Sequence, residues 1–236
     1  MKIEEIKRHL NKDKKKNISI SGFIDNYPIE EIIKAGKSIL ITGRSDHLWA
    51  YISSADPREF RILIQKFNFA TRYFASLENW MLPLIKKRKK LEWELDTLRY
   101  ILPDYVKIDD PAYNIKKLKP EHGEDIFQNT NYQEFTSVDY IKERIETGIS
   151  GGVFEDEKLV AWGLTHDDGA LGFLHVLPDF RRKGLGIEII KYLINKKRSY
   201  NEPVFANIEP DNIKAINLVE KLGFVFDREI YWIKIQ

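Results

Sequence analysis

Residues 174–198 read LHVLPDFRRKGLGIEIIKYLINKKR, and they carry the strongest indication of the fold. The first residues of this stretch read as a β-strand, which Pro178 is expected to end. A short loop, residues 181–186, then leads into a helix. Apolar residues recur along that helix at helical spacing: Ile187, Ile190, Leu193 and Ile194. The loop therefore stands at the N-terminus of a helix, directly after a strand.

The composition of this loop is typical of an anion-binding site. Gly184 and Gly186 carry no Cβ, so backbone N–H groups can approach a ligand closely. Together with the N-terminus of the helix, these donors form a cradle for an anion. The cations of Arg181, Arg182 and Lys183 favour a phosphate group there. The loop matches neither the G-x-G-x-x-G dinucleotide fingerprint nor the G-x-x-x-x-G-K-[ST] P-loop.

A family resemblance rests on this loop and on a second motif. Arg181-x-x-Gly184-x-Gly186, after a strand ending Val176-x-Pro178, resembles the acyl-CoA pyrophosphate motif of the GNAT superfamily of N-acetyltransferases. Downstream, NIKAINLVEKLGF (residues 212–224) is similar to that family's helix and turn, and residues 203–210 stand where its fifth strand is expected. The resemblance covers 113–236 and implies an α+β (mixed α/β) chain. Its C-terminal domain would have the GNAT acyl-CoA N-acyltransferase fold, preceded by a smaller α/β lobe.

Between residues 103 and 112 the sequence favours a linker. Pro103 and Pro111 bias the residues before them toward extended backbone, and Asp109 and Asp110 are expected to be solvated. We therefore expect an N-terminal α/β lobe over 1–108, without a CoA motif, and a GNAT-like domain over 112–236. This layout resembles that of glycine N-acyltransferase-like proteins, which implies that the first lobe is a degenerate GNAT-like half.

Local patterns predict the elements of both parts. In the first part we expect helices at 28–36, 57–67 and 79–90, and strands at 38–43, 48–54, 69–76 and 91–102. In the second part we expect a strand at 113–120, helices at 121–130 and 137–148, and three antiparallel strands between 151 and 178. Ser137 is the expected N-cap of its helix. Trp162 and Trp232 are expected in the core, with stacking in an acceptor pocket as the alternative.

The composition excludes several classes of function. The 236 residues include no cysteine, so disulfides, thiolate metal sites and a cysteine nucleophile are excluded. A net charge of +2 does not favour nucleic-acid binding, and we expect the basic runs 14–16 and 86–90 to be solvated helix ends rather than phosphate contacts. The histidines show no metal-ligand spacing, so no metal is expected. With no signal-peptide pattern and no membrane-length apolar run, we expect a cytoplasmic protein.

The resemblance also implies roles for individual residues. The N–H groups of 182–186 would bind the CoA pyrophosphate, with Arg181 opening the loop. The backbone of Leu174, His175 and Val176 would pair with the pantetheine arm. The N–H of Val176 would polarise the thioester carbonyl. The predicted cofactor-binding residues are Leu174, His175, Val176, Arg181, Arg182, Lys183, Gly184, Leu185, Gly186 and Asn212, with acetyl-CoA as co-substrate.

The chain departs from the family's best-known members at two positions. Ala170 stands where several of them place a Glu or His base, and Val219 stands where many place a tyrosine acid. The base could be His175, Glu209 or the Asp167-Asp168 turn. His175 has the wrong strand parity to face the acceptor unless a β-bulge intervenes, and a structural role is the alternative. Glu209 could act as the base or as an anchor for the amine, and the alternative is a solvated acid.

We therefore expect an acyl-CoA-dependent N-acyltransferase. The reaction would transfer acetyl from acetyl-CoA to a primary amine of a small molecule or amino acid by direct attack, consistent with the absence of cysteine. The partner would be that small-molecule amine, with neither nucleic acid nor membrane. The alternative is a non-catalytic acyl-CoA-binding module, because Ala170 and Val219 lack the usual groups.

Overall fold

The computed structural model describes residues 3–130 and 132–236, and the chain forms two compact units. The first unit contains residues up to Arg99, Ile208–Asn212 and Phe226–Gln236. The second unit contains Tyr100–Asn207 and Ile213–Val225. The C-terminal strand thus groups with the first unit, although it is the last element of the chain. The division into domains at 1–108 and 112–236 stays a prediction.

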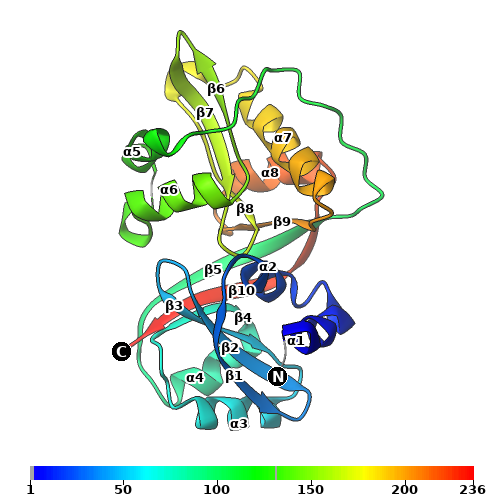
Figure 1. Cartoon of the computed structure of the whole chain (residues 1–236), viewed down its shortest axis with the longest axis vertical. Coiled ribbons are helices and arrows are strands. Elements are labelled where there is room, and N and C mark those ends of the chain that lie inside the picture. Colours follow the sequence, from blue (N-terminus) through cyan, green and yellow to red (C-terminus); the bar gives the residue numbers. More distant parts are fainter. Residues whose placement is uncertain (1–2, 131) are drawn as a thin grey trace. The chain divides into compact units, whose positions relative to one another are not determined.

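The first unit is a mixed sheet with helices on both faces (Figure 1). Its strands follow the order β1-β2-β3-β4-β10-β5. They are β1 (Ile29–Ala35), β2 (Ser38–Arg44), β3 (Leu48–Ser53), β4 (Tyr73–Glu78), β10 (Val225–Ile235) and β5 (Leu91–Leu102). Helices α1 (Ile3–Leu10) and α2 (Ile18–Asn26) contribute to one apolar cluster on this sheet. A second cluster receives α3 (Pro57–Phe67) and α4 (Leu82–Lys86).

Most predicted elements of the first unit are confirmed, but the helix expected at 28–36 is wrong. That segment is β1, which pairs with β2 from Ala35↔Ser38 onward. Gly36 has a φ of +57°, so it forms the tight turn between the two strands rather than a helix C-cap. The helix expected at 79–90 is shorter, with a 3-10 turn at Asn79–Met81 before α4. The strand expected at 69–76 is β4, displaced toward the C-terminus.

Members of the two basic runs have structural partners. Lys16 binds the backbone carbonyl of Ser54 and pairs with Glu78 at 3.2 Å. The run 86–90 begins at the last residue of α4, Lys86, which pairs with Glu94 at 2.7 Å. The absence of a nucleic-acid partner nevertheless stays a prediction.

The second unit is built on four strands in the order β9-β8-β7-β6. Strands β6 (Ser150–Glu155), β7 (Lys158–Thr165) and β8 (Leu171–Val176) are antiparallel, and β9 (Val204–Ile208) runs parallel to β8. Helices α5 (Gly123–Gln128) and α6 (Val138–Thr147) pack on the face that carries Trp162 and Leu164. The opposite face receives α7 (Leu185–Ser199), since a Cβ on Gly163 would touch Ile189 and Leu193.

The remaining elements of this unit are α8 (Ile213–Lys221) and three single 3-10 turns, Pro120–His122, Gln133–Phe135 and Pro178–Phe180. Ser137 caps α6 as predicted, accepting a hydrogen bond from the Tyr140 N–H at 3.1 Å. The strand expected at 113–120 is wrong, because it is reduced to one bridge between Lys116 and Gly152. The α+β class is confirmed. In the described residues no helix has the length and apolar character needed to cross a membrane.

Candidate active site

The site begins where β8 and β9 stop pairing. A single parallel pair, Leu171↔Ala206, joins the two strands, both of which continue beyond it. From Gly172 onward, the described residues of β8 have no register partner on β9. The edge of β8 that faces away from β7 is therefore open. An extended ligand can bind such an edge through main-chain hydrogen bonds.

The N–H of Val176 points to this open edge. The next residue, Leu177, donates its N–H to the Val160 carbonyl on β7 at 2.9 Å. Because successive N–H groups of a strand point to opposite edges, the Val176 N–H points away from β7. The carbonyl of Val176 accepts the Nε–H of Arg181 at 3.0 Å. Arg181 thus ties the loop to the end of β8, while the Val176 N–H has the orientation that its predicted role requires.

The loop after β8 offers a row of backbone donors. Arg182 and Gly184 have positive φ values of 62° and 82°, whereas Lys183 between them does not. Alternation of this kind makes a concave nest of N–H groups that binds anions. Throughout the described parts of the chain, the N–H groups of residues 182–186 meet no protein acceptor. The first turn of α7 supplies the last of these donors, as the free N–H groups of a helix start do.

The space around the loop fits a ligand. A Cβ built on Gly184 would meet nothing within 4 Å, so the space in front of this residue is open. A Cβ on Gly186 would lie 3.6 Å from Leu218 of α8, 3.8 Å from Val176 and 3.9 Å from Leu174. These three side chains form an apolar floor beside the donors. Donors, open space and apolar floor together suit the phosphate and alkyl parts of a CoA-like molecule.

A β-bulge in β8 determines where His175 points. Trp162 pairs with His175 and Leu164 pairs with Gly172, so β8 uses one residue more than β7 over this interval. Phe173 has a φ of +51° at this irregularity. The bulge supplies the change of parity that the sequence argument required of His175. His175 consequently lies on the face of Trp162, which is the face covered by α5 and α6.

The environment of His175 favours the neutral imidazole. Its ring stacks on Trp162, with centroids 4.8 Å apart and planes 17° from parallel. Burial lowers the pKa of His175, and the positive charge of Arg181 lowers it further. At neutral pH the ring therefore carries a free lone pair and can accept a proton. Trp162 itself is 2% exposed, so its predicted place in the core is confirmed.

Two side chains that the sequence did not indicate, His166 and Tyr140, lie on the same face. The His166 ring is 4.8 Å from that of Phe173, and the Tyr140 ring lies 6.3 Å from Phe173. A Cβ on Gly172 would fall 2.0 Å from Nε2 of His166, so the glycine makes room for this imidazole. In the sequence, the only indication of this contact is a glycine, Gly172, that faces a histidine, His166, across the β7–β8 hairpin. That indication is weak, because only the pairing register of the two strands shows that the glycine and the histidine meet.

The other candidate bases differ in their surroundings. Asp168 is 2% exposed, and its Oδ1 accepts the Ala170 N–H at 2.9 Å, which closes the hairpin turn. Glu209 and Asn212 lie between β9 and α8, where the Asn212 N–H donates to the Glu209 carbonyl at 3.0 Å. Both group with the first unit, so their predicted roles stay predictions. Ala170 and Val219 are buried apolar residues and offer no proton-transfer group.

Comparisons with known proteins agree on the fold. Residues 147–233 match the family described as FR47-like protein. A Drosophila protein of known structure is 18% identical, with a TM-score of 0.75 over 84% of this chain and 74% of that one. A putative GNAT-family acetyltransferase from Novosphingobium aromaticivorans is 17% identical, with a TM-score of 0.58 over 92% and 94%.

A third structure is that of a tandem GNAT protein. This tandem GNAT protein from the clavulanic acid biosynthesis pathway is 12% identical, with a TM-score of 0.52 over 93% of this chain and 87% of that one. No curated protein matches the sequence. The chain thus has the GNAT N-acetyltransferase fold, as the motifs predicted. The likeness to glycine N-acyltransferase-like proteins stays a prediction.

Proposed function

We propose that this chain, which has the GNAT N-acetyltransferase fold, is an acyl-CoA-dependent N-acyltransferase. The observation that carries the proposal is the combination of an open β8 edge with five N–H groups, at residues 182–186, that meet no acceptor among residues 3–130 and 132–236. One feature suits the pantetheine arm and the other suits the pyrophosphate of the same molecule. The FR47-like match over 147–233 and the GNAT neighbours support this assignment.

Two kinds of interaction bind acyl-CoA: hydrogen bonds and charges at its pyrophosphate, and main-chain pairing along its pantetheine arm. The N–H groups of the loop and the first turn of α7 hold the pyrophosphate, and the exposed cations of Arg182 and Lys183 add to the attraction. The backbone of residues 174–176 pairs with the amides of the pantetheine arm. This pairing brings the thioester carbonyl to the N–H of Val176, which stabilises the oxygen as it gains negative charge.

The acyl transfer needs a neutral amine and an acceptor for its proton. The amine nitrogen attacks the thioester carbon, the new C–N bond forms, and the C–S bond breaks to release CoA as thiolate. Nitrogen loses a proton to the imidazole of His175, directly or through a water molecule. The lowered pKa of His175 supports this role, because the imidazole is neutral when the amine arrives. The chain has no cysteine, in keeping with transfer without a thiol-linked intermediate.

We propose a primary amine of a small molecule or amino acid as the acceptor. His175 and Phe173 lie on β8, and the rings of His166, after β7, and Tyr140, on α6, lie beside Phe173, so an amine bearing an apolar or aromatic group has a complementary surface there. Val219 provides no acid for the thiolate, which is a tolerable leaving group near neutral pH.

The test is thiol release from acetyl-CoA in the presence of a panel of primary amines, with and without the protein. We expect thiol release that depends on the amine and saturates with acetyl-CoA. Saturable CoA binding without thiol release for any acyl-CoA would favour a second function, a CoA-binding module without turnover. This second function is favoured because Ala170 stands in place of the usual base and Val219 in place of the usual acid, and both are buried apolar residues.

A further inference from the structure

A segment near the start of the second unit is attached to α7. We call residues 110–113 the strap. Asn195 of α7 donates from Nδ2 to Asp110 Oδ1 at 3.0 Å, and the N–H of Ala112 donates to Glu188. Figure 1 shows the segment after β5 passing α7 before it reaches β6. Beyond the strap, Lys116 exchanges two backbone hydrogen bonds of 2.9 Å with Gly152. The strap is therefore held to α7 directly, and the chain that follows it is held to β6 through Lys116.

Glu188 gives the strap a firm attachment. Glu188 is 7% exposed, and its Oε1 accepts a hydrogen bond from the Lys191 ammonium at 2.9 Å. Burial raises the pKa of Glu188, but hydrogen bonds from Lys191 and Ala112 outweigh it and leave the pKa below its ordinary value. An ionised carboxylate that is buried in this way holds its backbone donor strongly. The residue after Ala112 is consequently fixed in place.

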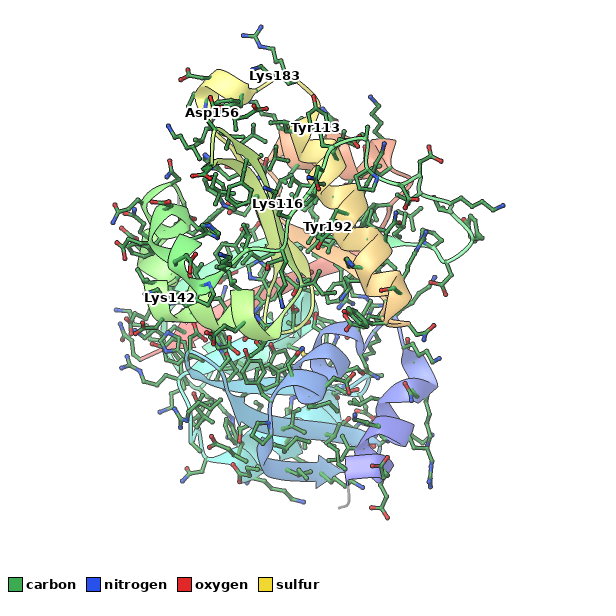
Figure 2. All side chains as sticks on the ribbon, turned by 45° about the horizontal axis from the view of Figure 1, so that its top comes forward. Tyr113, Lys116, Lys142, Asp156, Lys183 and Tyr192 are labelled. Carbon is green, nitrogen blue, oxygen red and sulfur yellow. The ribbon has the colours of Figure 1, made fainter. Side chains whose placement is uncertain are left out.

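That residue is Tyr113, whose hydroxyl donates to the backbone carbonyl of Lys183 at 3.2 Å. Figure 2 labels Tyr113 and Lys183 near each other at the N-terminal end of α7, with Tyr192 farther along this helix. Lys183 is the second residue in the row of free N–H groups at 182–186, directly before Gly184. Tyr113 is thus a side chain from outside the loop that binds the loop backbone.

The bond to the Lys183 carbonyl determines where the next N–H points. In a trans peptide the carbonyl of one residue and the N–H of the next point in opposite directions. The chain has no cis peptide bond among its described residues, so the Gly184 N–H points away from Tyr113. The space in front of Gly184 is open within 4 Å.

We propose that Tyr113 is a positioning residue for the acyl-CoA pyrophosphate. By holding the Lys183 carbonyl, it turns the Lys183–Gly184 peptide so that the Gly184 N–H faces the anion before the ligand arrives. This inference rests on the proposed function. It adds that the strap, which lies outside the sequence motif, sets the affinity for the co-substrate.

The test compares Tyr113→Phe with Tyr192→Phe in the full chain. Each change removes one phenol oxygen, that of Tyr113 beside α7 or that of Tyr192 on α7, and among the described residues the Tyr192 hydroxyl has no hydrogen-bond partner. CoA binding is measured by calorimetry, and KM and kcat by thiol release from acetyl-CoA. Circular dichroism and thermal melting verify that both variants fold.

We expect Tyr113→Phe to raise the Kd for CoA and the KM for acetyl-CoA about three- to tenfold, the usual effect of one lost hydrogen bond. Because Val176 and His175 are untouched, kcat should not change. Tyr192→Phe should match the wild type. Equal CoA affinity for the wild type and Tyr113→Phe, or an effect confined to kcat, overturns the positioning role and leaves the proposed function standing. A wild type that binds no CoA overturns both.

Discussion

The imidazole of His175 stacks on the indole of Trp162 across β7 and β8, with ring centroids 4.8 Å apart and an angle of 17° between the planes. The extra residue in β8 at Phe173 makes this pairing possible, because it returns His175 to the face of Trp162. Trp162 is buried, so the stack fixes the imidazole plane at the edge of the open strand. The same contact excludes water and contributes to the lowered pKa of His175.

Replacing His175 with glutamine tests its role as proton acceptor. We expect kcat for acetyl transfer to fall by about 100-fold or more, the usual contribution of a positioned base. In the wild type, activity should be lost as the pH falls through the pKa of His175, because the protonated ring cannot accept a proton. Since that pKa is lowered, the acidic limb of the pH profile lies below pH 6.5, the ordinary histidine value. A matched His47→Gln variant in the first unit should keep both the kcat and the acidic limb of the pH profile of the wild type.

The charge of Arg181 should be visible in the titration of His175. Replacing Arg181 with glutamine removes the cation that lowers the pKa of His175, so the pKa should rise. Burial remains, so it should stay below 6.5. Imidazole chemical shifts in an NMR titration measure this directly, with Arg182→Gln as the control. An unchanged His175 pKa in Arg181→Gln would show that the charge of Arg181 does not affect the protonation of His175.

The sequence was most informative where a motif is continuous. The loop at 181–186, helix α7 and the β7–β8 hairpin follow from local glycine spacing and apolar periodicity, and the structure confirms them. The bulge at Phe173 could not be predicted, because a bulge changes parity without requiring a special residue type. Tyr113 was missed because its partner, Lys183, is 70 residues away and is contacted through a backbone carbonyl.

The incorrect helix at 28–36 has a similar cause. Pro28 and Gly36 are consistent with a helix start and stop, but Gly36 with positive φ serves a hairpin turn equally well. The pairing of β1 with β2 then decides between the two, and that is a contact between segments rather than a local preference.

Replacing Gly184 with alanine should weaken CoA binding. A non-glycine residue at a φ of +82° costs about 1–2 kcal/mol, so the loop would leave the conformation that presents its N–H groups. We expect the Kd for CoA to rise by about tenfold, measured by calorimetry.

Gly169→Ala provides the control for backbone strain. Gly169 has a φ of +83° in the β7–β8 turn, and an added Cβ would approach only the flexible end of Lys197, at 3.3 Å. This variant should lose similar stability but keep its affinity for CoA. Equal loss of affinity in the two variants would show that general destabilisation, rather than the cradle, is responsible.

The N-cap of α6 offers a test of local stability beside the acceptor face. Ser137→Ala removes the acceptor for the Tyr140 N–H and should cost about 1 kcal/mol of unfolding free energy. Ser137→Asp keeps an acceptor and should be near the wild type. Urea denaturation followed by circular dichroism measures both. Equal midpoints for the alanine and aspartate variants would mean that the cap contributes nothing.

Mass spectrometry of a complete reaction tests whether the protein transfers acetyl from acetyl-CoA to an amine. The protein is incubated with acetyl-CoA and the most active amine of the panel, and both the acetylated amine and free CoA thiol are quantified. We expect one acetylated amine for each thiol released, no acetyl group on the protein as an obligatory intermediate, and formation of both products that is slower by about 100-fold or more in His175→Gln. Thiol release without acetylated amine, or neither product with any amine or acyl-CoA, would contradict it.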